Sequence, residues 1–256
     1  MEKFSFIRHG EKMGDQERVP LEESGLTPEQ QQKWLEAREV VGIGIDPGIT
    51  YENLPVIEKM AEDIFNKLPE KSLLLFTSTD FPRTKMTNAL LSMELSRLAL
   101  QNPDKNIATG SIWEPKEVAE QEDSISNLPG EAKGFLELWK EFEKSEEAQS
   151  DPSLKEYFEQ GGGKAHPKEQ EIIFKLANKD LANPNSIFKK RAEQIKGQIE
   201  SFKDKYPDED YKTYFFGIGH VSTLIPVDVA LNGREKYDSA EEIPTPLTII
   251  QAEERK

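Results

Sequence analysis

The sequence predicts an α/β fold with three layers, in which a mostly parallel central sheet is flanked by helices. Short apolar runs of strand length alternate with longer segments of helical periodicity, and this alternation favours parallel pairing. The 256 residues are enough to bury a sizeable core. This length suits one large domain or two small ones.

The strands are predicted from apolar runs that end at turn or polar residues. Phe4 to Ile7 stops at Arg8-His9-Gly10, and Ser72 to Phe76 (SLLLF) is a continuous apolar run of the kind found in buried parallel strands. Gly110 weakens the third run, and Gly219-His220 closes the fourth. The predicted strands are residues 4–7, 72–76, 106–113, 211–218 and 246–251.

The helices are predicted from apolar spacing and from their start signals. A polar loop over residues 12–30 leads into a helix capped by Thr27, with Pro28 at its first position. Residues 54–68 place five apolar side chains on one face. Further helices are predicted at residues 83–100 and 224–231, and residues 130–206 contain helices broken at Pro152, Gly161–Gly163, Pro167 and Pro184.

Composition excludes several classes of function. The chain has 48 acidic and 33 basic residues, for a net charge of −15, which argues against a nucleic-acid binder or a membrane-surface binder. It has no cysteine, so disulfides, thiolate metal sites and cysteine nucleophiles are absent, as suits a cytoplasmic protein. No signal peptide and no apolar run of bilayer length is recognisable. An anionic substrate would therefore need a local cluster of positive charge.

Such a cluster is predicted at the carboxyl ends of the strands. Arg8 and His9 follow the first strand, Arg83 lies shortly after the second, and His220 follows the fourth. Ligands of open α/β sheets collect at these ends, so we expect the four side chains to converge. Two guanidiniums and two imidazoles would form a pocket for an anion.

These residue types suit phosphoryl transfer. A neutral imidazole can attack phosphorus and split one difficult displacement into two easier steps. A second histidine, if protonated, would stabilise charge on the phosphoryl oxygens together with the arginines. A carboxylic acid with a raised pKa can then protonate the leaving alkoxide.

Four segments resemble the histidine phosphatase superfamily, also called the phosphoglycerate mutase-like family. The stretch FSFIRHGEK at residues 4–12 is similar to its signature, and Gly25 to Glu29 resembles its Gly-x-Leu-Thr segment, without the intervening residue. Ser78 to Thr87 is similar to its Ser-x4-Arg-x3-Thr segment, and Phe216 to His220 resembles the segment with the second histidine. The resemblance implies a phosphoglycerate mutase-like fold in a single domain over residues 1–256, with a helical cap or insertion at about residues 125–206.

The resemblance also implies roles for the clustered residues. His9 would be the nucleophile, and the phosphoryl group would be held by Arg8, Arg83 and His220. The family's proton donor is often a Glu shortly after the third strand, which favours Glu114, with Glu117 and Glu120 as close competitors. Val221 stands where the acid-phosphatase branch carries Asp, which argues against that branch.

The sequence therefore predicts an enzyme that hydrolyses phosphate monoesters through a phosphohistidine, with no metal and no cofactor. Its partner would be a small phosphorylated substrate or a phosphoprotein. A phosphate-recognising module with little turnover and a phosphoglycerate mutase-type phosphotransferase are the alternatives. Gly161-Gly162-Gly163-Lys164 lacks the spacing of a phosphate-binding P-loop, and the neighbouring His166 is interpreted as a loop residue.

Overall fold

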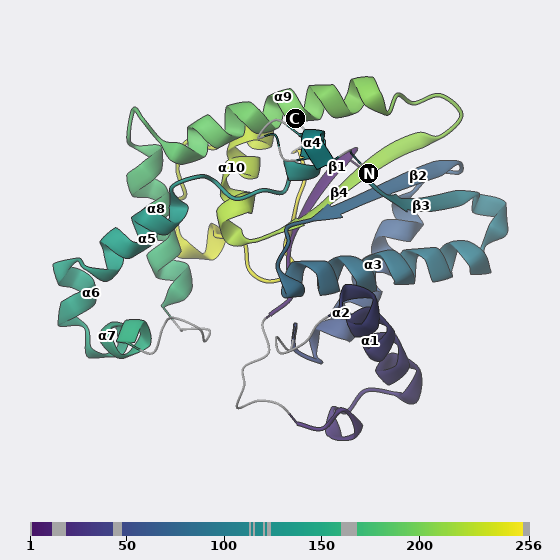
Figure 1. Cartoon of the computed structure of the whole chain (residues 1–256), viewed down its shortest axis with the longest axis horizontal. Helices are drawn as coiled ribbons and strands as arrows, with labels where there is room; N and C mark the ends of the chain where they lie inside the picture. Colours follow the sequence, from purple (N-terminus) through teal and green to yellow (C-terminus); the bar gives the residue numbers. More distant parts are fainter. Residues whose placement is uncertain are drawn as a thin grey trace.

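The fold is built on one five-stranded sheet, seen in a computed structural model of the chain (Figure 1). The structure describes residues 2–11, 19–42, 48–112, 114, 116–119, 121, 124–159 and 168–252. The strands run in the order β3-β2-β4-β1-β5. Their bounds are β1 Phe4–Arg8, β2 Ser72–Ser78, β3 Ile107–Ser111, β4 Lys212–Gly219 and β5 Ile249–Ile250.

Strand direction agrees with the sequence prediction in four of these strands. β1 pairs in parallel with β4, and β2 pairs in parallel with both β3 and β4. β5 is antiparallel to β1 and only two residues long, shorter than the run predicted at residues 246–251. The α/β prediction with a mostly parallel sheet is therefore confirmed, and the antiparallel edge makes the sheet mixed.

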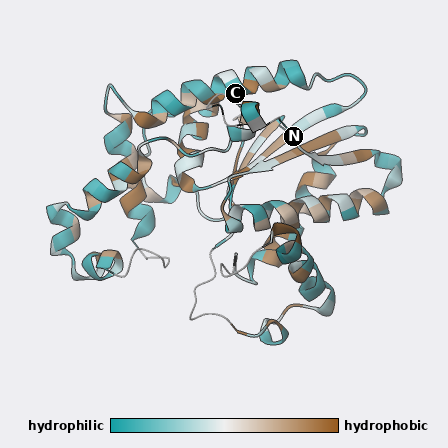
Figure 2. Ribbon diagram, viewed as in Figure 1, coloured by the Kyte–Doolittle hydropathy of each residue, from teal (hydrophilic) through white to brown (hydrophobic). Residues whose placement is uncertain are grey.

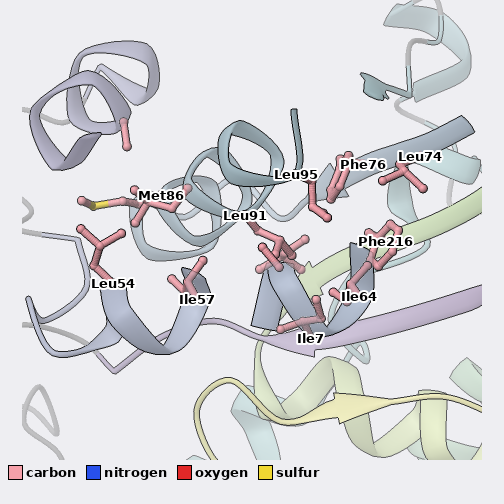
Figure 3. Packing of buried hydrophobic residues seen from close by; sticks show 14 of the residues in the cluster. Ile7, Leu54, Ile57, Ile64, Leu74, Phe76, Met86, Leu91, Leu95 and Phe216 are labelled. Carbon is pink, nitrogen blue, oxygen red and sulfur yellow. The ribbon is translucent and has the colours of Figure 1, made fainter. Parts of the chain in front are cut away.

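Three helices cover one face of the sheet: α1 (Pro28–Val41), α2 (Asn53–Lys67) and α3 (Pro82–Gln101). The start of α1 is the one expected from the sequence, because the side chain of Thr27 accepts from the amide of Gln30 in a capping box and Pro28 is the first helical residue. Figure 3 shows their apolar side chains packed on the sheet. This buried cluster includes Ile7, Phe76, Phe216, Leu54, Ile64, Met86 and Leu91.

Two helices cover the opposite face: α9 (Ile187–Lys205) and α10 (Val221–Asn232). They pack on the strand side chains that point away from the first cluster, as the alternation along a strand requires. The second buried cluster includes Phe4, Phe6, Leu75, Phe215, Ile195, Phe202 and Leu224. Helices on both faces give the three layers that the sequence predicts.

The chain between β3 and β4 forms a helical segment, whose first helix is the short α4 (Lys116–Ala119). The next four helices gather to one side of the sheet (Figure 1): α5 (Phe135–Glu143), α6 (Glu146–Ser150), α7 (Pro152–Glu159) and α8 (Glu169–Leu181). The segment ends with α9. Apolar side chains of α5, α7 and α8 form a small core of their own. Pro152 begins α7, and Pro184 lies between α8 and α9, as expected of helix breakers. The predicted breaks at Gly161–Gly163 and Pro167 lie outside the described residues.

Short 3-10 helices complete the fold: η1 Leu21–Glu23, η2 Pro103–Lys105, η3 Ile125–Asn127 and η4 Ala240–Glu242. Hydrophilic residues dominate the outer surfaces of the helices, and hydrophobic residues concentrate in the strands (Figure 2). Within the described part of the chain, no helix combines the length and apolar character needed to cross a membrane.

Candidate active site

The strand register brings the two predicted histidines together. Arg8 of β1 lies opposite Gly219 of β4. His9 and His220, which follow these strands, therefore lie side by side at the carboxyl ends of the strands. The His9 amide donates to the Gly219 carbonyl at 3.0 Å, and the two imidazole centroids lie 4.8 Å apart. Both side chains are buried, with exposed fractions of 8 % and 5 %.

Arg83, at the second position of α3, bridges the two imidazoles. Its Nε donates to His9 Nε2 at 3.1 Å, and its Nη2 lies 3.3 Å from His220 Nδ1. A guanidinium can only donate hydrogen bonds, so both of these ring nitrogens must be unprotonated acceptors. One arginine therefore holds both histidines in the neutral form.

The opposite ring nitrogens complete the tautomer assignment. His9 Nδ1 lies 2.5 Å from the Gly10 carbonyl oxygen and donates a hydrogen bond to it. His220 Nε2 lies 3.3 Å from Thr79 Oγ1, and Thr79 in turn donates to Thr84 Oγ1 at 2.9 Å. His9 is thus protonated on Nδ1 with its lone pair on Nε2, the nitrogen that a phosphoryl acceptor would use.

Burial and positive charge keep both histidines neutral. Burial lowers the pKa of His9 to about 2, and the positive charges of Arg83 and Arg8 act in the same direction. Burial also lowers the pKa of His220 to about 3, again with Arg83 and Arg8 contributing. Both imidazoles are therefore neutral near pH 7.

The loop after β1 is fixed by small residues and by partners from the first helical layer. The Gly10 amide donates to Thr87 Oγ1 at 3.0 Å, and the Glu11 amide donates to Asn53 Oδ1 at 3.1 Å. A Cβ at Gly10 would lie 2.9 Å from Asn53 Oδ1, closer than real contacts allow. Gly10 is therefore required for the close approach that places His9.

Arg8 reaches the same region but is engaged by other partners. Its Nη1 donates to the Pro244 carbonyl at 2.6 Å, and its Nη2 lies 3.3 Å from Glu169 Oε1. Its buried Nε has no hydrogen-bond partner among the described residues. Burial lowers the pKa of Arg8, and the charge of Glu169 opposes this effect.

Glu114 does not join this cluster through any contact among the described residues. Its carboxylate accepts from Ser124 Oγ, from the Ser126 amide at 2.9 Å and from Ser126 Oγ at 2.7 Å, and it lies 3.2 Å from Lys205 Nζ. Burial opposes its ionisation, but these hydrogen bonds lower the pKa of Glu114 to about 2. The carboxylate joins η3 to the end of α9 and stays ionised.

Of the other predicted donors, Glu117 is exposed in α4. Glu120 and the third histidine, His166, lie outside the described residues. Three partners of the site were not identified from the sequence: Thr79, Phe81 and Glu169. The ring of Phe81 meets His220 edge-on at 4.7 Å and lies 5.4 Å from the Arg83 guanidinium. Only Thr79 and Phe81, at a strand end, carried a positional signal.

No group of three or more acidic or histidine side chains among the described residues is placed to hold a metal ion. Three cavities of the described structure are lined by no histidine. They measure about 620 Å³ between α2 and β5, about 450 Å³ after α10, and about 410 Å³ between α3 and β3. The strand ends, where both described imidazoles lie, are therefore the candidate for chemistry. No protein-family model matches the chain, and no curated protein is significantly similar to it.

Proposed function

We propose that this protein hydrolyses phosphate monoesters through a phosphohistidine on His9. The observation that carries the proposal is the bridging contact of Arg83, which keeps both imidazoles neutral and leaves the lone pair of His9 on Nε2. A neutral imidazole with its lone pair presented beside two guanidiniums has the properties needed to accept a phosphoryl group.

In the proposed reaction, a phosphoryl dianion takes over the hydrogen bond that Arg83 donates to His9. The lone pair of Nε2 forms the bond to phosphorus as the bond to the leaving-group oxygen breaks, and that oxygen takes up a proton from a carboxylic acid or from water. Water then attacks phosphorus, the bond to Nε2 breaks, and inorganic phosphate leaves. Arg8 and Arg83 hold the phosphoryl oxygens throughout, and His220 joins them once the negative charge of the dianion has raised its pKa and its Nδ1 has taken up a proton.

A phosphoglycerate mutase-like fold and a cytoplasmic location belong to the same proposal. The order β3-β2-β4-β1 with parallel pairing supports the fold assignment, because the segments that resemble this family then follow the carboxyl ends of neighbouring parallel strands. The lack of cysteine is compatible with a reducing compartment.

The test is turnover of an aryl phosphate, whose weakly basic leaving group needs no proton donor. We expect His9→Ala to abolish turnover at neutral pH, while His166→Ala, the matched change at the third histidine, retains it. Rapid quenching of the wild type with labelled substrate should trap an acid-labile phosphoprotein that His9→Ala does not form. Equal turnover by wild type and His9→Ala would contradict the mechanism.

A phosphate-recognising module with little turnover is the second candidate. The observation in its favour is Glu114, which is ionised and fully engaged with Ser124, Ser126 and Lys205, so it is not available as an acid. Binding of inorganic phosphate without turnover of any ester would support this candidate. A mutase would instead show a phosphoenzyme that persists and returns its phosphoryl group to an added alcohol.

A further inference from the structure

A carboxylate of the helical segment contacts the phosphate clamp, the name used here for Arg8, His9, Arg83 and His220. Glu169 is the first residue of α8, a helix of 13 residues, and its Oε1 lies 3.3 Å from Arg8 Nη2. The ion pair is sheltered, since the side chains of Arg8 and Glu169 are 12 % and 30 % exposed. The contact joins residues separated by 161 positions in the chain, so it depends on how α8 docks.

This carboxylate leaves an excess of negative charge once phosphate is bound. Arg8 and Arg83 carry two positive charges and the histidines are neutral, so a phosphoryl dianion balances the clamp. Glu169 then stands as an additional anion, and the carboxylate of Glu11 also acts on Arg8, whose pKa it raises. With phosphate bound, Arg8 is therefore shared between the phosphate and the carboxylates of Glu169 and Glu11.

Glu169 can also receive a cation other than Arg8. Its carboxylate already accepts from Nη2 of the Arg8 guanidinium, and an ammonium group donates to a carboxylate in the same way. Arg8 keeps its hydrogen bond to the Pro244 carbonyl, so the guanidinium stays anchored when Glu169 turns to a ligand.

We propose that the site selects phosphate monoesters whose organic part carries a positively charged amine, and that Glu169 is the residue that recognises the amine. This inference rests on the phosphate-binding part of the proposed function and not on turnover. Phosphate displaces Glu169 from Arg8 Nη2, and the ammonium group of the same ligand takes the place of the guanidinium beside the carboxylate. Esters with a second anionic group are disfavoured by the same charge.

The expected effect is large enough to measure. A carboxylate about 6 Å from the substituent, at an effective dielectric constant of about 40, changes affinity about tenfold for either sign of charge. The preference for an ammonium ligand over a carboxylate ligand should therefore fall by about a hundredfold when Glu169 loses its charge.

The experiment is calorimetric titration with two phosphonates of similar length, 2-aminoethylphosphonate and 3-phosphonopropionate, which are not hydrolysed. Wild type should prefer the amine, and Glu169→Gln should lose most of that preference. Glu171→Gln is the matched control on α8, because Glu171 pairs with Lys175 at 3.1 Å and has no contact with Arg8. It should bind both ligands as wild type does.

Three results would overturn the inference: no preference in wild type, an unchanged preference in Glu169→Gln, or no binding of either phosphonate. Circular dichroism of the variants checks that they are folded. Failure of the proposed function would look different. In that case wild type would prefer the amine and Glu169→Gln would not, but no ester would be turned over by wild type.

Discussion

Lowering the pH from 7 to 5 should destabilise this protein through its two buried histidines. In the folded state the pKa of His9 is lowered to about 2 and that of His220 to about 3, whereas in the unfolded chain both take an ordinary value of about 6.5. Below about pH 6.5 the two histidines therefore bind protons in the unfolded state but not in the folded state. The contribution of the neutral histidines to stability is complete above that pH and declines continuously as the pH falls toward 3.

The magnitude follows from the linkage between proton binding and stability. Between pH 7 and pH 5, each histidine with an unfolded-state pKa of about 6.5 that stays neutral when folded lowers the free energy of unfolding by about 2 kcal/mol. Two such histidines lower it by about 4 kcal/mol, a large part of the roughly 5–15 kcal/mol that stabilises a typical protein. Phosphate in the site should reduce the loss, because its negative charge raises the pKa of both imidazoles.

The assay is urea unfolding at pH 7 and pH 5, applied to wild type and to the double variant His9→Gln/His220→Gln. Glutamine keeps a polar side chain without a titrating group, so the double variant should be less stable at pH 7 but lose about 4 kcal/mol less between the two pH values. The comparison cancels the carboxylates, which titrate alike in both proteins. Equal losses in wild type and double variant would refute the argument, as would imidazole nitrogen signals that titrate near pH 6.5 in the folded protein.

Two further predictions concern groups that fix the site. Arg83→Lys should lower kcat/KM for an aryl phosphate by about a hundredfold to a thousandfold, because a lysine cannot donate to both imidazoles in the fixed geometry of a guanidinium. The circular dichroism spectrum should be unchanged, and activity near the wild-type level would contradict the bridging role of Arg83. Glu114→Gln should lower the free energy of unfolding by about 1–3 kcal/mol, since it weakens the contacts that join η3 to α9, and should leave kcat within about twofold. A large loss of kcat at unchanged stability would instead make Glu114 the proton donor that the sequence favours.

The convergence of the clamp was predictable because strand direction fixes where the next residue goes. His9 and His220 each follow a parallel strand, and the register of β1 with β4 sets them side by side without reference to any other part of the chain. The position of Arg83 is fixed in a similar way, since α3 begins at Pro82, with Phe81 as its N-cap, shortly after β2 ends at Ser78. In each case the position of the site residue could be predicted from the point at which the preceding apolar run ends.

The direction of the Glu114 side chain could not be predicted in this way. It lies three residues beyond β3, at a position that suits a donor, yet its carboxylate turns toward Ser124, Ser126 and Lys205. Lys205 is 91 residues away in the sequence, so the contact depends on the packing of α9 against the sheet. No periodicity or spacing distinguishes a carboxylate that faces the site from one that anchors a loop behind it.

Glu169 sharpens the same point, because it belongs to a segment that the sequence described only as broken helices. Its position at the start of α8 is a local property, but its contact with Arg8 depends on how α8 packs against α9 and α10. The buried cluster that joins these helices includes Ile173, Ala177, Leu181, Phe188 and Ile225, and none of its described members belongs to a strand. Under the proposed function, phosphate binding would therefore depend on the strand ends, whereas selectivity for the rest of the substrate would depend on the docking of α8. A substitution in this cluster should consequently change which esters bind before it changes whether phosphate binds.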